Sequence, residues 1–151
     1  MALSADATWL GYTTKDIACL ATKTMVIKNA ATVYYGSLLS HDTDQGAVKP
    51  FDGTQTDRLV GWHWAGTKTG STTAPLPRAT IKPGGFIAEV PVTGLSGTAT
   101  DYGMIVYATD DGTYTLTDPG SGINVGRVMA DEDRASGSAW VYFRNFLETI
   151  T

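Results

Sequence analysis

The sequence predicts an all-β fold, a β-sandwich or small β-barrel with an extended N-terminal arm. The first observation is composition: of 151 residues only 17% are charged, while glycine, with 17 residues, is abundant. Threonine is also frequent, and it suits a pleated, half-exposed surface as glycine suits turns. The second observation is a series of short segments, rich in β-branched and aromatic residues, between turn signals. We expect one core built from about eight to ten strands.

Residues 1–22 differ from the rest of the chain because their apolar residues follow no sustained period of 2 or of 3.6. We therefore predict an extended arm over 1–22 and a β-sandwich or barrel domain over 23–151. The aromatic side chains of such an arm gain free energy only when covered, so the arm packs on its own domain or on a neighbour. The candidate contact residues of the arm are Leu3, Trp9, Leu10, Tyr12 and Ile17.

Strand signals begin near residue 23, with β-branched and aromatic residues over 24–42 around the loop at 28–31. Turns follow at Gly46, Pro50 and Asp52-Gly53. A glycine-, threonine- and proline-rich loop over 67–79 precedes the alternating strand at 81–92.

The strongest hairpin signal is Asp111-Gly112, between "MIVYAT" and "TYTLT". A two-residue type I′ turn needs positive φ, which Asp and Gly tolerate, so we predict that turn here. The remaining segment, 123–146, predicts two strands separated by an acidic loop.

Two parts of the chain share a short sequence pattern, which we call the internal echo. Each part begins with Tyr-Gly and ends with Val-Gly after an apolar strand and an Asp/Gly turn. Both dipeptides are common, so duplication and chance remain alternatives. The paired positions are Tyr35-Gly36 with Tyr102-Gly103 and Val60-Gly61 with Val125-Gly126.

Trp62 and Trp64 should project from one face of the strand at 59–64, with His63 on the other face. On the inner face the two indoles are core residues, which we favour. On the outer face they would form an aromatic contact surface for a sugar ring or a partner protein.

The second copy of the echo carries a family resemblance. The segment "GMIVYATDDGTYTLTDPGSGINVGRVM", followed by "GSAWVYF", has a Gly-x-x-Val-Tyr opening, an Asp-Gly hairpin and a Gly-Arg-Val before a closing strand. This pattern resembles the small decoration, or cement, proteins of tailed-bacteriophage capsids. The match covers residues 102–143 and, more loosely, 23–61; the arm and the Trp62–Trp64 region have no counterpart.

The resemblance implies a protein made in the host cytoplasm that sits on the outer surface of a phage head. Its partners would be the major capsid protein and itself, as homotrimers at three-fold and quasi-three-fold sites. Binding would rest on complementary surface shape and on strands added to a sheet edge. The arm of about 20 residues could span up to roughly 65 Å if extended.

Other function classes find little support in the sequence. The net charge of −4 without clustered Lys or Arg argues against nucleic acid, and no secretion signal or membrane span is visible. We expect no cofactor, no metal and no catalytic site, because the acidic pairs lie in loops and serve as turn formers. A weak calcium site at Asp110-Asp111-Gly112 with Asp118, a carbohydrate- or receptor-binding module using exposed Trp62, Trp64 or Trp140, and a small carboxylate hydrolase remain the alternatives.

Overall fold

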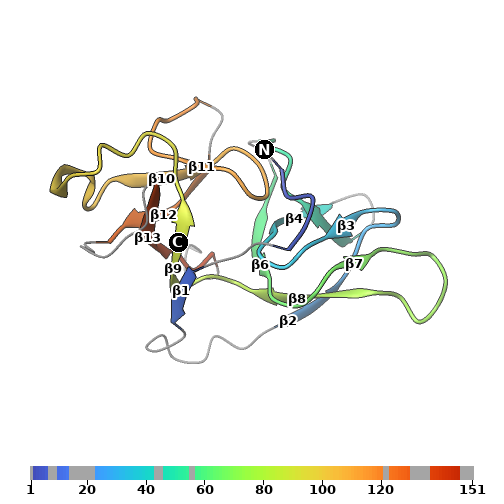
Figure 1. Cartoon of the computed structure of the whole chain (residues 1–151). Coiled ribbons are helices and arrows are strands. Elements are labelled where there is room, and N and C mark those ends of the chain that lie inside the picture. Colours follow the sequence, from blue (N-terminus) through green and yellow to red (C-terminus); the bar gives the residue numbers. More distant parts are fainter. Residues whose placement is uncertain are drawn as a thin grey trace.

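The computed structural model describes residues 2–6, 10–13, 23–42, 46–54, 57–120, 123–129 and 137–146 (Figure 1). Its elements confirm the all-β prediction, with one short 3-10 turn, η1 (Ala99–Asp101), between strands. Within the described ranges, no helix is long and apolar enough to cross a membrane. The strands are β1 (Leu10–Thr13), β2 (Lys23–Val26), β3 (Thr32–Val33), β4 (Leu38–Asp42), β5 (Ala47–Pro50), β6 (Leu59–His63), β7 (Lys68–Thr69), β8 (Arg78–Lys82), β9 (Phe86–Pro91), β10 (Ile105–Ala108), β11 (Tyr114–Thr115), β12 (Ile123–Val128) and β13 (Ser138–Phe143).

The strands form two main antiparallel sheets. The six-stranded sheet has the order β1-β9-β13-β12-β10-β11, the five-stranded sheet has the order β2-β8-β6-β4-β5, and β3 pairs with β7. The described strands outnumber the eight to ten expected, because β3, β7 and β11 have two residues each and show no alternation in the sequence.

The two sheets repeat one strand order, which makes the internal echo structural. We call residues 23–82 the first unit and 83–146 the second unit. The order β2-β8-β6-β4-β5 in the first unit matches β9-β13-β12-β10-β11 in the second. Figure 1 shows the two units side by side along the long direction of the molecule.

The register of the two units also matches, including one β-bulge. In each unit the bulge falls on the valine before a glycine, Val60 before Gly61 and Val125 before Gly126. Chance repetition of common dipeptides does not reproduce a bulge at one position of one strand pair. The pairs beside the bulges are Leu39–Gly61 and Ser40–Leu59 in the first unit, and Val106–Gly126 and Tyr107–Asn124 in the second.

Each unit also curls so that the first and last strands of its five-strand order meet. Ile27, just after β2, forms a parallel bridge with Val48 of β5, and Thr93, just after β9, forms one with Thr115 of β11. These bridges partly close each unit into a small barrel, consistent with the predicted alternatives of sandwich or barrel.

The hairpin predicted at Asp111-Gly112 is confirmed, but its turn type is wrong. The loop between β10 and β11 spans residues 109–113, and neither Asp111 nor Gly112 has a positive φ. Asp110 organises this wider loop, because its Oδ1 accepts the N–H groups of Gly112 at 2.9 Å and Thr113 at 2.8 Å. The hydrogen bonds of Asp110 therefore hold a five-residue loop in place of the two-residue type I′ turn that the Asp-Gly pair predicts.

Two apolar clusters fill the units, and the larger one crosses between them. The smaller cluster lies within the first unit and includes Ile27, Leu39 and Ile81. The larger cluster joins the inner faces of β9, β10, β12 and β13 to residues of the first unit. The first unit contributes Leu38, Phe51 and Trp62 to it.

The repeated bulge predicts the effect of a small substitution. A methyl group at Gly126 would overlap the carbonyl oxygen of Tyr142 on the neighbouring strand. We expect Gly126→Ala to lower the free energy of unfolding by about 1–3 kcal/mol in urea titrations, because the strand must shift. Gly66→Ala is the matched control, since a methyl group there meets nothing within 4 Å. Equal stability of the two variants would contradict the close approach.

Candidate interaction surfaces

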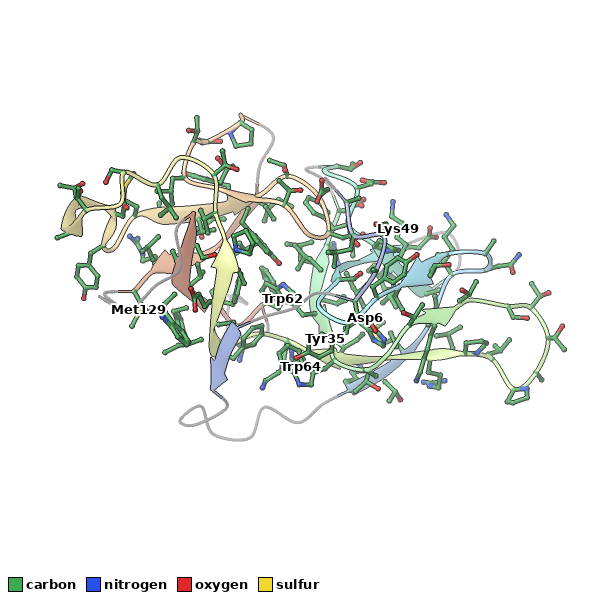
Figure 2. All side chains as sticks on the ribbon, viewed as in Figure 1. Asp6, Tyr35, Lys49, Trp62, Trp64 and Met129 are labelled. Atoms are coloured by element: carbon green, nitrogen blue, oxygen red, sulfur yellow. The ribbon has the colours of Figure 1, made fainter. Side chains whose placement is uncertain are left out.

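A short N-terminal strap, residues 2–6, contacts both units. The Leu3 N–H donates to Oδ1 of Asp111 in the second unit at 3.0 Å. Oδ1 of Asp6 accepts from the N–H of Tyr35 at 2.6 Å and from Oγ1 of Thr67 at 3.1 Å, both in the first unit. Figure 1 shows this dark-blue segment beside the boundary between the units, and Figure 2 labels Asp6 close to Tyr35. The strap therefore ties the two units together with polar contacts.

Asp111 is the point at which the strap and both units meet. Asp111 is 2% exposed, and its carboxylate accepts from the Leu3 N–H through Oδ1 and from the Ser37 hydroxyl, at 2.9 Å, through Oδ2. Its carbonyl oxygen accepts the Leu38 N–H at 2.9 Å. Burial raises the pKa of Asp111 above its usual 3.8, although both hydrogen bonds oppose the shift.

Gly112, next to Asp111, lies against the strap, and its φ is not in the positive range that favours glycine. A methyl group at Gly112 would overlap the side chain of Leu3. Leu3, an arm contact residue expected from the sequence, thus packs on its own chain in this structure. The absence of a side chain at position 112 leaves the space that Leu3 occupies.

The other arm residues are placed only in part. Leu10 and Tyr12 belong to β1, which pairs antiparallel with β9 so that Leu10 lies opposite Glu89. Trp9 and Ile17 lie outside the described residues. Among the described strands β1 is one edge of the six-stranded sheet.

Trp62 lies in the core between the units. It is 0% exposed, and its ring packs against Phe86, Phe143 and Phe146 of the second unit at 4.8–5.3 Å between centroids. Its Nε1–H donates to the Tyr114 hydroxyl at 3.0 Å. The core interpretation of Trp62, which the sequence favoured, agrees with this position.

Trp64 lies beside Trp62 but nearer the surface. It is half-buried, with its ring 5.1 Å from Phe86 and 5.0 Å from Tyr35, and Lys82 Nζ lies 4.8 Å from its centroid. Protein groups therefore cover part of its ring. The two indoles do not form one exposed platform of the kind that stacks on a sugar.

Sequence reasoning missed the exposed apolar residues of the described surface. Three of the four large ones lie at one corner of the second unit, which we call the apolar corner: Tyr102, Met104 and Met129, exposed by 61%, 41% and 37%. Backbone hydrogen bonds from Gly103 N to Val128 O and from Val128 N to Met104 O join the two segments. The fourth is Leu76, 42% exposed, in the segment between β7 and β8.

In the described loops, acidic side chains accept hydrogen bonds from backbone N–H groups. Besides the Asp110 contacts, Asp101 accepts the N–H groups of Ser96 and Gly97, and Asp118 accepts the N–H of Gly120. Among the described residues, no group of three or more His, Cys, Asp or Glu side chains is placed to hold a metal ion. The candidate calcium residues thus have loop-forming roles in this structure.

A substitution at Asp111 tests the strap by its pH dependence. Because the folded-state pKa is raised, Asp111 stabilises the protein most when it is protonated, and this contribution is lost as pH rises from 3.8 through the folded-state pKa. Asp111→Asn removes the ionisation and keeps an oxygen acceptor. We expect the stability of Asp111→Asn relative to wild type, measured by urea unfolding, to increase as pH rises through that window. A difference independent of pH would show that the carboxylate is not ionising in a buried site.

Comparisons with known proteins bear on the fold. No protein-family model matches the sequence, and a search of curated proteins found no match. Among solved structures, a chain from the capsid of the Myoviridae phage XM1 superimposes with a TM-score of 0.52 and 16% identity, over 87% of this chain and 89% of that chain. At this identity the likeness shows a shared fold, over nearly the whole length of both chains.

Proposed function

We propose that the protein is a non-enzymatic decoration, or cement, protein of a tailed-phage head. It binds the outer surface of the assembled shell and stabilises it, as a homotrimer at three-fold and quasi-three-fold sites. The observation that carries the proposal is the fold shared with a chain of a phage capsid over 87% of this chain. The resemblance of residues 102–143 to decoration proteins independently supports the same class.

The surfaces of the chain are suited to binding a partner without catalysing a reaction. β1 is an edge strand among the described strands, and an edge can accept a further strand from the major capsid protein through backbone hydrogen bonds. The arm residues Trp9, Tyr12 and Ile17 would supply apolar contacts to the capsid. Three such subunits acting together bind as one multivalent unit, so modest contacts per copy suffice.

The main alternative is a carbohydrate- or receptor-binding module of the virion. That function would use an exposed indole platform, but Trp62 is fully buried, Trp64 is half-covered by its neighbours and Trp140 is half-buried. These positions favour the decoration role over glycan binding.

Cosedimentation with undecorated heads of the phage that encodes the chain tests the proposal. We expect wild-type protein to pellet with the heads at a saturating ratio and to raise the temperature at which the heads release DNA. Protein that stays in the supernatant at all concentrations would refute the decoration role, and glycan binding by that protein would support the alternative.

A second variant tests the arm while keeping the strap intact. We expect the combined change Trp9→Ala, Tyr12→Ala and Ile17→Ala to weaken head binding at least tenfold, because apolar contact area is lost. The control is Thr117→Ala, an exposed position outside the arm. Wild-type binding by the arm variant would remove these residues from the contact.

A further inference from the structure

The second unit shows what pairs with the outer edge of its first strand. β1 pairs antiparallel with β9, with Leu10 opposite Glu89, and adds a sixth strand to the five-strand order that both units share. In the first unit the strand equivalent to β9 is β2, which is the last strand of its sheet among the described strands. Figure 1 shows β1 beside β9, and β2 along the lower margin of the first unit. The repeat therefore contains one edge that is paired and one equivalent edge that is not.

Backbone hydrogen bonds identify the equivalent residues of the two edges. In each unit, two consecutive residues after the first strand donate their N–H groups in opposite directions, one toward the neighbouring strand and one to the last strand of the unit. The donors and acceptors are Ile27 to Pro77 and Lys28 to Val48 in the first unit, and Val92 to Gly137 and Thr93 to Tyr114 in the second. Counting back three residues from Ile27 and from Val92 makes Thr24 the equivalent of Glu89, the residue that pairs with β1.

The backbone groups of Thr24 face the open side of β2. The Lys28 N–H points away from β8, to Val48, and backbone direction alternates along a strand, so the N–H and C=O of Thr24 also point away from β8. Thr24 is exposed, whereas its equivalent Glu89 is only 7% exposed. The exposed guanidinium of Arg78 donates to the Thr24 carbonyl at 3.3 Å and to its hydroxyl at 3.2 Å. In the first unit an arginine side chain thus binds the carbonyl whose equivalent in the second unit faces a strand.

The surroundings of the β2 edge are positively charged. Residues 23–34 and 64–83, which contain β2, β3, β7 and β8, hold five Lys or Arg and no Asp or Glu. Lys28 pairs with Asp42 of β4 at 2.7 Å, but Lys23 and Arg78 are exposed at the edge itself. A strand that pairs with β2 would place its side chains beside these cations, and cross-strand pairs of opposite charge are stabilising.

We propose that the β2 edge binds an extended, acidic segment of a partner protein as an additional antiparallel strand centred on Thr24. The occupant is a strand because the repeat places one, β1, at the equivalent edge, and it is acidic because the edge is basic. On binding, the Arg78 guanidinium leaves the Thr24 carbonyl, which accepts a backbone N–H, and pairs with a carboxylate of the incoming segment. The β1 segment of a second copy, Leu10–Thr13, has no acidic residue and lacks this complementarity. The inference rests on the proposed function only for the source of the segment, a protein of the phage head.

Amide signals of the ¹⁵N-labelled protein test the edge with a defined probe. The probes are a short blocked peptide that alternates Thr with Glu, and its counterpart that alternates Thr with Lys. We expect the Glu peptide to shift the amides of Thr24 and Val26 and to bind at least about fivefold more tightly than the Lys peptide, because exposed ion pairs contribute modestly. Unchanged Thr24 and Val26 amides would overturn strand pairing at β2, and equal binding of the two peptides would overturn the selection of acidic segments.

Thr24→Pro tests whether the backbone makes the contact. Proline removes the outward N–H, and an edge strand tolerates proline on that side, so folding should be retained, as circular dichroism would verify. We expect Thr24→Pro to abolish binding of the Glu peptide, whereas Thr24→Ala, which keeps the N–H, should bind it about as tightly as wild type. Full binding by folded Thr24→Pro would overturn the inference.

Charge reversal at Arg78 gives a second readout that does not alter the backbone of β2. Arg78→Glu should remove the preference for the Glu peptide over the Lys peptide. The control is Arg58→Glu, at an exposed position elsewhere in the first unit, which makes the same change in net charge and should keep the preference. Equal effects of the two variants would show that overall charge, and not the β2 edge, selects the peptide.

Experiments with undecorated heads separate the inference from the proposed function. We expect the heads to protect the amides of residues 23–27 from hydrogen exchange and to bind Thr24→Pro more weakly than wild type. Equal head binding by wild type and folded Thr24→Pro would leave the decoration role standing and overturn the assignment of the β2 edge to it. Selective binding of the Glu peptide by a protein that does not pellet with heads would support the β2 edge and refute the decoration role.

Discussion

The structure depends on one buried side chain, the indole of Trp62. It projects from β6 of the first unit into the aromatic cluster of the second, where Phe86 and Phe143 pack against the indole and against each other. A buried indole needs a partner for its N–H, and the Tyr114 hydroxyl provides one at 3.0 Å. Burial raises the pKa of that hydroxyl, so it remains neutral and accepts the bond.

The size of the units explains why they share a core. A β-unit of about 60 residues buries a smaller fraction of its surface than a larger domain does and is marginally stable alone. The smaller cluster of the first unit stays within that unit, while Leu38, Phe51 and Trp62 extend the larger cluster across the boundary. Asp111 and the strap then close the polar rim of the same boundary. Leu38, Phe51 and Trp62 therefore give the two units one shared apolar core.

Sequence reasoning reached the fold class, the hairpin and the repeat because each has a local signal: β-branched segments, an Asp-Gly pair, and matched Tyr-Gly and Val-Gly dipeptides. It failed where tertiary contacts decide the conformation. The turn at Asp111-Gly112 is wider than its dipeptide predicts, since Asp110 binds the loop and Asp111 bonds to the first unit. The apolar corner gave no signal, because Tyr102 and Met104 have the composition of a strand start, and only the completed fold shows which side chains stay exposed.

The repeat also gives the molecule a direction. Two identical units joined by a two-fold axis would present the same residues at both ends and would favour symmetric pairing. Here the units follow one another in the chain with the same strand order, while their charges and exposed residues have diverged. The first unit, with more Lys and Arg than Asp and Glu, exposes Leu76 between two prolines, whereas the second unit, with more Asp and Glu, exposes Tyr102, Met104 and Met129. The two units therefore share one strand order while the side chains that each presents to the solvent differ, so the repeat fixes the backbone and leaves each end of the molecule its own surface.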